Sequence, residues 1–382
     1  MKKIKELHSY FLQSSGICTD TRKITENCLF FALKGENFNG NKFADEALEK
    51  GAFKVVIDDI RYHRNTGETI LFGSSLKALQ KLATFHRQEL GIPILSLTGS
   101  NGKTTTKELI NAVLSQKFKT TATQGNFNNH IGVPLTLLSM NSKTEMGVVE
   151  MGANHQKEID ALCEIALPDY GYITNFGKAH LEGFGGIEGV IKGKTELYRH
   201  LKARDKMVFV NGNDPRQLQY SKGMTQYTFG NEAQDCHIQL KNASGKLIIA
   251  YKDQTIETNL IGVYNFRNAA AAIAIGAYFE VPAPAIKKAI ENYIPDNNRS
   301  QLITRGSNQI ILDAYNANPT SMMAALENFA QSEGDQKIMF LGDMFELGVD
   351  ADAEHQNIVN YLEQNPFGNQ RYYRYGLRIM AV

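Results

Sequence analysis

The sequence predicts an α/β protein built around a doubly wound, mostly parallel sheet, and three observations support this fold class. Apolar runs of strand length alternate with helical stretches along most of the 382 residues. The apolar run 94–97 leads through a glycine-rich turn into a helical stretch at 107–114, an order typical of such sheets. The composition, 42% hydrophobic and 21% charged, is that of an ordinary globular protein. The length exceeds that of a single core and favours two or three domains.

Compositional changes divide the chain into three predicted domains, 1–84, 85–297 and 298–382. The first boundary falls on a helix expected at 74–90, and the second on the turn-forming segment 295–298. Strands are expected at 28–33, 53–57, 94–97, 147–151, 170–175, 246–251, 309–313 and 338–341. Helices are expected at 43–50, 74–90, 107–114, 158–165, 265–279, 319–330 and 353–362.

The third predicted domain has an unusual end. It restarts a βαβα pattern, but the segment 369–375 is rich in arginine and tyrosine and lacks apolar periodicity. Because two parallel strands form a poor sheet, we expect this domain to be incomplete.

Charge and hydropathy limit the partners. The formal net charge is +1 and no basic cluster occurs, so no nucleic-acid binding is expected. The longest uncharged apolar run, 269–279, is too short for membrane insertion, and the first residues lack the apolar block of a secretory signal. Four cysteines without metal-ligand spacing predict reduced thiols in a cytoplasmic protein. They are Cys18, Cys28, Cys163 and Cys236.

The segment 97–106 has the order of a phosphate-binding loop, with Gly-x-x-Gly-Lys-Thr between a strand and a helix. Backbone N–H groups at a helix start lack intrahelical partners and can bind phosphate oxygens. Lys103 would reach the β- and γ-phosphates, and the Thr104 hydroxyl would bind Mg²⁺. The general pattern has a glycine where Leu97 stands, and the alternative is a glycine turn with a solvated lysine. The predicted nucleotide-binding residues here are Gly99, Ser100, Asn101, Gly102, Lys103, Thr104 and Thr105.

Other polar side chains follow neighbouring strands. Glu150 ends an apolar strand at the edge expected to carry the phosphate loop, where a carboxylate can hold Mg²⁺; the alternative is a helix cap or a surface acid. His180 follows the next strand and is either a metal ligand or a polar loop histidine. From the residues alone, Lys192 and Lys194 indicate a solvated helix face.

Two loops are rich in hydrogen-bonding side chains. They lie at 125–134 and 313–319, the second directly after an expected strand. Such runs are unlikely in a core and are typical of loops that recognise a polar ligand. For the second loop, a turn with an asparagine cap is the alternative.

Taken together, these segments closely resemble the Mur ligase family, the ATP-dependent amide-forming enzymes of peptidoglycan synthesis. The resemblance covers about residues 17–360. It implies a small N-terminal α/β domain, a central P-loop domain and a Rossmann-like C-terminal domain. The family's final lysine-glycine-serine-arginine block is absent here, so the C-terminal domain is expected to be partial. The resemblance rests on segments 98–104, 125–134, 150–153, 264–272, 313–319 and 342–348.

The resemblance implies roles for the matching residues. ATP and two Mg²⁺ ions would be the cofactors, and Lys194 matches a lysine that the family carbamylates, which turns a cation into an oxygen ligand. The implied catalytic residues are Lys103, Glu150, His180 and Lys194. The implied metal ligands are Thr104, Glu150, His180 and Lys194. Further ATP contacts are implied for Asn268, Arg299 and Asp313.

The implied substrate contacts lie in all three domains. The muramyl-peptide path would follow Asn126, Asn128, Asn129 and His130. The incoming dipeptide would face Tyr315, Asn316 and Asn318. The UDP end would be held by Thr21, Arg22 and Lys34, near a segment where the family's Asp-Gly-His is replaced by residues 39–41, Asn-Gly-Asn.

Among the activities of the family, the match favours addition of D-alanyl-D-alanine to UDP-N-acetylmuramoyl-tripeptide through an acyl phosphate. The alternatives are another Mur-type or folylpolyglutamate-type ligase, and a nucleotide-binding remnant without turnover. A GTPase is less favoured because no guanine-reading Asn-Lys-x-Asp follows. We expect a monomer, and the sequence does not determine whether the third peptide residue is lysine or diaminopimelate.

Overall fold

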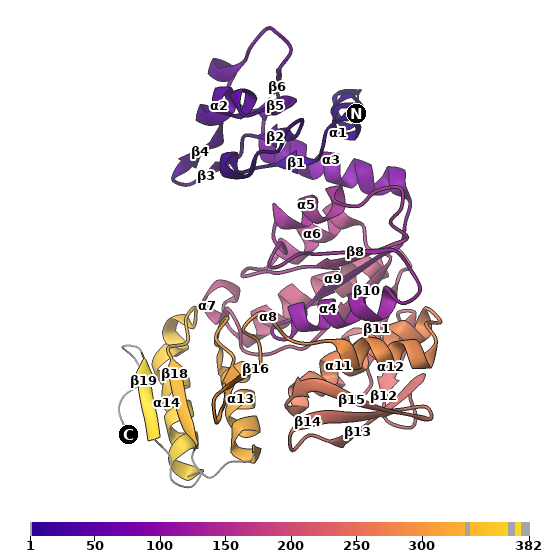
Figure 1. Ribbon diagram of the computed structural model, residues 1–382, viewed down its shortest axis with the longest axis vertical. Coiled ribbons are helices and arrows are strands. Elements are labelled where there is room, and N and C mark those ends of the chain that lie inside the picture. The colour runs from indigo at the N-terminus through magenta and orange to yellow at the C-terminus, as the bar shows by residue number, and fades with distance from the viewer. Residues whose placement is uncertain (1, 333–336, 366–370, 376–382) are drawn as a thin grey trace.

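The structure is a computed structural model that describes residues 2–332, 337–365 and 371–375. Figure 1 shows three units in chain order: an N-terminal unit at the top of the view, a central unit below it, and a C-terminal unit at the lower left. Within these described ranges, no helix is both long enough and apolar enough to cross a bilayer.

The N-terminal unit contains a four-stranded parallel sheet of order β1-β2-β5-β6. It ends in the long helix α3 (Ser75–Leu90), which begins where the Ser74 side chain accepts the Lys77 N–H and ends at Gly91 with φ +63°. Because α3 packs against α1 and also against α5 and α6, it joins the first two units. The other elements are α1 (Lys2–Gln13), β1 (Ile17–Cys18), η1 (Thr21–Lys23), β2 (Leu29–Phe31), β3 (Lys34–Gly35), β4 (Phe38–Asn39), η2 (Gly40–Phe43), α2 (Ala44–Glu49), β5 (Lys54–Ile57), η3 (Ile60–Tyr62) and β6 (Thr69–Leu71).

The central unit is built on a nine-stranded sheet of order β15-β14-β13-β12-β11-β10-β7-β9-β8. Neighbouring strands from β8 to β13 are parallel, whereas β13, β14 and β15 pair antiparallel. The doubly wound, mostly parallel sheet is therefore confirmed. The strands are β7 (Ile94–Thr98), β8 (Thr120–Ala122), β9 (Met146–Glu150), β10 (Tyr170–Ile173), β11 (Met207–Asn211), β12 (Gln226–Gly230), β13 (Cys236–Asn242), β14 (Lys246–Tyr251) and β15 (Gln254–Ile261).

Helices cover both faces of this sheet. Every residue of β7, β9 and β11 is buried, and alternate side chains pack into two cores. Leu95 and Leu97 belong to the core with α4, α11 and α12, whereas Ile94 belongs to the core with α5, α6 and α9. The helices are α4 (Lys103–Leu114), α5 (Gly132–Leu138), α6 (Glu158–Ala166), α7 (Leu181–Phe184), α8 (Ile187–Lys194), α9 (Glu196–Lys202), α10 (Pro215–Tyr220), α11 (Val263–Tyr278) and α12 (Ala283–Asn292).

The C-terminal unit has a looser sheet arrangement than its βα pattern predicts. β17 forms an antiparallel hairpin with β16, and β18 pairs in parallel with β19, so the described strands form two separate two-stranded sheets. The helices α13 and α14 pack against each other. The elements are β16 (Gln301–Arg305), β17 (Asn308–Leu312), α13 (Pro319–Gln331), β18 (Ile338–Gly342), η4 (Gly348–Asp350), α14 (Ala351–Gln364) and β19 (Arg371–Tyr375).

Two expectations for this unit were wrong. The segment 309–313 was expected to open a parallel βαβα unit, but it is the second strand of a hairpin whose first strand, β16, the sequence did not predict. The absence of strand periodicity in 369–375 was misleading, since residues 371–375 form β19; residues 369 and 370 lie outside the described part of the chain. Backbone pairing with β18 forms this strand without an alternating apolar pattern.

Candidate active site

A cavity of about 1580 Å³ opens between the central and C-terminal units. It is lined by the phosphate loop, the ends of β9 and β10, the start of α11 and the first residues of α13. β7 lies between β9 and β10 in the parallel sheet, with Leu97 opposite Glu150 and Thr98 opposite Ile173. The loops that follow these three strands therefore meet at one edge, where ligands bind in open α/β sheets.

The phosphate loop needs its two glycines for both conformation and space. Gly99 has φ +146° and Gly102 has φ +75°. A Cβ atom on Gly99 would lie 2.0 Å from Thr174 Oγ1, and one on Gly102 would lie 2.5 Å from Asn268 Oδ1. Only glycine combines these backbone angles with such close neighbours. The shortened loop is therefore held tightly at the N-terminus of α4.

Lys103 lies folded against its own loop. Its Nζ donates to the carbonyl oxygens of Gly99 at 2.9 Å and Ser100 at 3.1 Å. Burial lowers the pKa of Lys103 below its usual value; the Glu150 carboxylate opposes this change and the Arg299 guanidinium adds to it. The ammonium is thus restrained by carbonyls that an incoming phosphate can replace.

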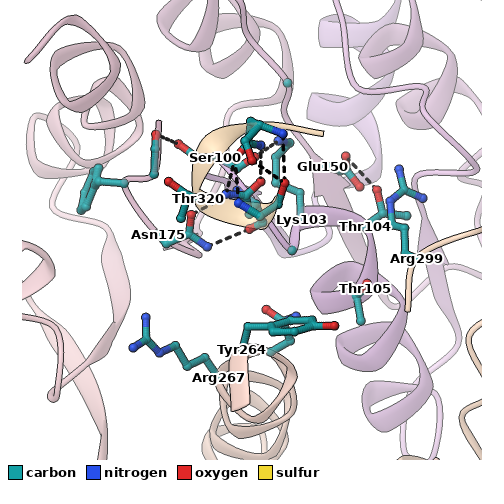
Figure 2. A pocket seen from close by; sticks show the side chains of 18 of the residues that line it. Ser100, Lys103, Thr104, Thr105, Glu150, Asn175, Tyr264, Arg267, Arg299 and Thr320 are labelled. Carbon is teal, nitrogen blue, oxygen red and sulfur yellow. Dashed lines mark hydrogen bonds between the residues drawn. The ribbon is translucent and has the colours of Figure 1, made fainter. Parts of the chain in front are cut away.

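Glu150 faces the phosphate loop at the end of β9. It is 1% exposed, which rules out a surface acid. Its Oε1 accepts from Asn128 Nδ2 at 2.7 Å and from Thr104 Oγ1 at 3.3 Å, the latter contact drawn in Figure 2. Its buried Oε2 has no hydrogen-bond partner among the described residues. An orphaned carboxylate oxygen beside a threonine hydroxyl fits the oxygen ligands that Mg²⁺ prefers.

The expectation of a solvated helix face was wrong for Lys194. Lys192 is exposed, as expected, but Lys194 is only 1% exposed at the end of α8. Its Nζ donates to the Ala153 carbonyl at 3.1 Å and lies 5.0 Å from the centre of the Phe184 ring. Burial, reinforced by the Lys103 charge, holds the pKa of Lys194 well below its usual value. Burial therefore shifts the Lys194 equilibrium toward the neutral amine.

His180 lies at the start of α7 and lines the cavity. Its Nδ1 contacts a carboxylate oxygen of Glu346 from the C-terminal unit. Burial lowers the pKa of His180, Glu346 opposes this effect, and the charges of Lys103 and Lys194 add to it. His180 thus shares one electrostatic environment with the phosphate loop.

The loop after β10 fixes the phosphate loop from the other side, a role that sequence reasoning missed. Asn175 accepts the Asn101 N–H at its Oδ1 (3.1 Å) and donates to the Asn101 carbonyl (2.9 Å). Ser100 Oγ donates to the Gly177 carbonyl at 2.8 Å. Figure 2 shows Asn175 beside the loop. The only signal in the sequence was that an Asn-Phe-Gly segment follows a strand end.

Asn268 is brought to the phosphate loop by α11. Its Oδ1 accepts from Thr106 Oγ1 at 3.0 Å, and its Nδ2 donates to Asn265 Oδ1 at 2.9 Å. Both asparagines are buried. Tyr264 and Arg267 come from the same helix and face the cavity in Figure 2. These neighbours were not singled out as site residues from the sequence.

The C-terminal unit contributes a cation and a carboxyl to the cavity. The Arg299 guanidinium stacks 3.6 Å from the centre of the Tyr315 ring. Asp313 accepts the Ser300 N–H at 3.2 Å, and burial raises the pKa of this carboxyl despite that bond and the nearby Arg299 charge. Arg299 is also close to Thr104 and Glu150 in Figure 2.

A pair of asparagine amides links the phosphate loop to α13. Asn318 Nδ2 donates to Asn101 Oδ1 at 2.6 Å, and Asn101 Nδ2 donates back to Asn318 Oδ1 at 3.3 Å. Asn318 also caps α13, as its place before a proline suggested, by accepting the Ser321 N–H. Close by, the Lys178 N–H donates to Thr320 Oγ1 at 2.9 Å. The C-terminal unit thus contacts the site mainly through polar groups.

The remaining candidate residues divide into two sets. The amide-rich loop and the 313–319 loop line the cavity, although Asn129 uses its Oδ1 to accept the Ile131 and Gly132 N–H groups at the start of α5. By contrast, the N-terminal candidates are not among the lining residues, and two of them form local ion pairs, Arg22 with Asp20 and Lys34 with Asp58. The first set, which lines the cavity, is Asn126, Asn128, Asn129, His130, Tyr315, Asn316 and Asn318. The second set is Thr21, Arg22 and Lys34.

The fold and the site together define a phosphate-loop α/β protein whose site is closed by a second unit, and the comparisons identify its family. Three family models match: "Mur ligase family, catalytic domain" at residues 13–87, "Mur ligase middle domain" at 97–276 and "Mur ligase, glutamate ligase domain" at 298–366. The chain belongs to the Mur ligase family. The three-domain architecture is thereby confirmed, while the boundaries at 84/85 and 297/298 stay predictions.

Several relatives belong to one branch of that family. A UDP-N-acetylmuramoyl-tripeptide–D-alanyl-D-alanine ligase of Bacillus subtilis is 40% identical over 338 residues, which cover 87% of this chain and 74% of the relative. The ligase of the same name from Escherichia coli is 34% identical over 366 residues, covering 92% and 80%. The crystal structure of MurF from Acinetobacter baumannii has a TM-score of 0.84 at 30% identity and covers 97% of this chain and 85% of that one. MurF from Thermotoga maritima, solved with ADP, has a TM-score of 0.82 at 27% identity, covering 96% and 84%.

Proposed function

We propose that this chain is an ATP-dependent ligase that joins D-alanyl-D-alanine to UDP-N-acetylmuramoyl-tripeptide in peptidoglycan precursor synthesis. The observation that carries the proposal is the single cavity in which the phosphate loop, Glu150 and His180 meet Arg299 and Asp313 from the C-terminal unit. The named ligases of this branch, matched over most of their length, support the substrates. The four buried, unpaired cysteines support a cytoplasmic location.

The reaction is an amide synthesis driven by phosphoryl transfer. The terminal carboxylate of the tripeptide attacks the γ-phosphorus of ATP, which forms an acyl phosphate and releases ADP. The dipeptide amine then attacks the acyl carbon, and the C–N bond forms as inorganic phosphate leaves and the amine loses a proton. Lys103 and the N–H groups at the start of α4 would bind the transferring phosphate, with Arg299 approaching from the other unit.

Mg²⁺ would neutralise charge on the phosphates, as in other phosphoryl transfers. Thr104 and Glu150 would hold the first ion, because Glu150 Oε2 is buried without a partner. His180 and Lys194 are proposed as ligands of a second ion. For Lys194 this requires carbamylation, in which the neutral amine adds to carbon dioxide and releases one proton. Burial favours this neutral amine, and the Lys103 charge would stabilise the carbamate.

The remaining assignments rest on the resemblance to the Mur ligase family. Asn268 would lie on the adenine side and Asp313 near the ribose. The muramyl-peptide path would follow the amide-rich loop, and the dipeptide would face the 313–319 loop. The UDP end would be held by Thr21, Arg22 and Lys34 when the N-terminal unit meets the nucleotide sugar.

The proposal is tested by phosphate release from ATP with UDP-N-acetylmuramoyl-tripeptide, with and without D-alanyl-D-alanine. Phosphate release that requires both substrates is expected. Lys103→Ala should lower the rate of this release about 10³-fold, because the charge on the transferring phosphate is no longer stabilised by the ammonium group. Lys192→Ala is the matched control, since that lysine is exposed on α8. ATP binding without dipeptide-dependent release would contradict the ligase and favour a nucleotide-binding remnant.

A further inference from the structure

The loop that follows β18, residues 343–348, lies against α7 and contacts His180 directly. Glu346 reaches His180 Nδ1 with one carboxylate oxygen, while its own carbonyl accepts the Glu182 N–H at 3.2 Å. A Cβ on Gly348 would lie 3.2 Å from Glu182 Cβ, so this part of the loop is also in close contact. Glu346 therefore meets α7 through both its side chain and its backbone.

His180 and Glu346 share an unusual backbone conformation. His180 has φ +53° and Glu346 has φ +60°, a left-handed region that residues other than glycine seldom adopt. Such conformations cost free energy and persist where the surroundings enforce them, commonly at functional sites. Two of them face each other across the contact between the units, which is a second indication that the pairing serves the site.

The Glu346 loop is supported from behind by α14. His355 Nε2 accepts the Met344 N–H at 3.0 Å, and His355 Nδ1 pairs with the Ala351 carbonyl at 2.7 Å. Met344 and Leu347, on either side of Glu346, are each 2% exposed. The carboxylate is thus presented from a fixed loop.

We propose that Glu346 is the positioning residue for His180: it fixes the ring through Nδ1 and leaves Nε2 free to bind a cation, so this ligand is correctly set only when the C-terminal unit is docked. An ionised carboxylate can only accept, so Nδ1 donates to Glu346, and in the neutral ring Nε2 then keeps its lone pair. Histidine ligands of metals commonly donate their second ring N–H to a carboxylate, which fixes the tautomer and ring orientation. The inference rests on the proposed function in one respect, the role of His180 as a ligand.

The consequence is a link between domain closure and the metal site. Glu346 comes from the C-terminal unit and His180 from the loop after β10 of the central unit. When the units separate, the Nδ1 partner is lost and the ring is free to turn or change tautomer. The site would then be completed only in the closed enzyme, in which water is kept from the acyl phosphate.

The test measures the His180 tautomer by ¹⁵N nuclear magnetic resonance on the full chain, free of metal, nucleotide and substrates. The His180 signals are assigned by their loss in His180→Gln. In the unaltered chain the Nδ1–H form should predominate, and in Glu346→Ala, which removes the acceptor, it should become the minor form. The dissociation constant for Mn²⁺ with ADP should rise about tenfold in the same variant.

Glu354→Ala is the matched control. Glu354 is also in the C-terminal unit and pairs with Lys178 across the same contact at 2.5 Å, but the structure records no contact between it and His180. The tautomer and the Mn²⁺ affinity should stay unchanged in this variant. An unchanged tautomer or Mn²⁺ affinity in Glu346→Ala, or an equal change in Glu354→Ala, would overturn the inference. If the unaltered chain did not form the amide product, the proposed function would be contradicted instead, and the His180 tautomer could still be measured.

Discussion

The central and C-terminal units contribute to the same cavity, but they are held together in different ways. In the central unit, β7, β9 and β11 are buried at every position, and the phosphate loop stands on that core. In the C-terminal unit, β16 and β17 have no buried residue, and the sheets have only two strands each. Where this unit meets the cavity, an amide pair and an ion pair link it to the central unit, beside apolar side chains such as Leu347 that share a core with α7.

This difference assigns phosphate binding to the central unit and closure of the site to the C-terminal unit. Buried strands form one rigid edge, so the phosphate loop and Glu150 are in place before any ligand arrives. Polar contacts such as that between Asn101 and Asn318 exchange readily with water and each contribute only about 1 kcal/mol. Such contacts between the units can be broken and re-formed in each catalytic cycle, which suits an enzyme that must admit three substrates and then exclude water.

The largest effect expected from this comparison of the two units concerns Lys194, which is buried in the central unit. Lys194→Gln should lower ligase activity about 10²-fold or more, because it removes the group proposed to become a carbamate, while the melting temperature should not fall. Lys192→Gln, on the exposed side of the same helix, should change neither. With ¹³C-bicarbonate, the unaltered chain should show a carbamate signal that is lost in Lys194→Gln. A signal that persists in this variant would exclude Lys194 as its source.

A smaller effect is expected from the polar contact between the units. Asn318→Ala removes both the pair with Asn101 and the cap of α13, so kcat should fall about fivefold and stability by about 1 kcal/mol. Ser321→Ala removes only the reciprocal half of this cap, in which Ser321 Oγ accepts the Asn318 N–H, and should lower kcat less than twofold. Steady-state kinetics and denaturant unfolding of both variants separate the two roles. Equal values of kcat in both would mean that the amide pair does not contribute to closure.

The smallest expected effect concerns a pair of buried histidines, His8 and His86. His8 Nε2 lies 3.0 Å from His86 Nδ1, and burial lowers the pKa of both, with Glu89 opposing the effect on His8. Because the folded-state pKa values lie below the unfolded value of about 6.5, the neutral rings favour the fold above that pH, and this stability is lost as the pH falls below it. The melting temperature should drop by about 2–4 °C from pH 7.5 to 5.5.

The matched variant for this pH effect is His86→Gln. It removes one titrating ring while keeping a side chain able to hydrogen-bond the Met140 carbonyl. The drop in melting temperature between the two pH values should be smaller in this variant than in the unaltered chain. A drop of the same size would show that other groups cause the acid instability.

Much of the phosphate site could be predicted from the sequence, because local spacing creates it. Residues 99–105 lie between one strand and one helix, and the run that ends in Glu150 is short and apolar. Lys194 could not be placed in this way, since the same lysine fits a solvated face until the packing of α8 buries it. The only local signal for Asn175 is its place after a strand end, and Glu346 has no local signal for its role, because the partners of both residues lie far away in the chain.

The sequence by itself determined most of the elements, the mostly parallel sheet and the phosphate loop, because periodicity, glycines and caps act over a few residues. The tertiary structure decided which polar groups meet: Asn101 with Asn318, and His180 with Glu346. It also decided that β17 joins a hairpin and that residues 371–375 form a strand beside β18. Burial and long-range pairing depend on the whole fold, so the chemistry of Lys194 and His180 is set there and not by their neighbours in the sequence.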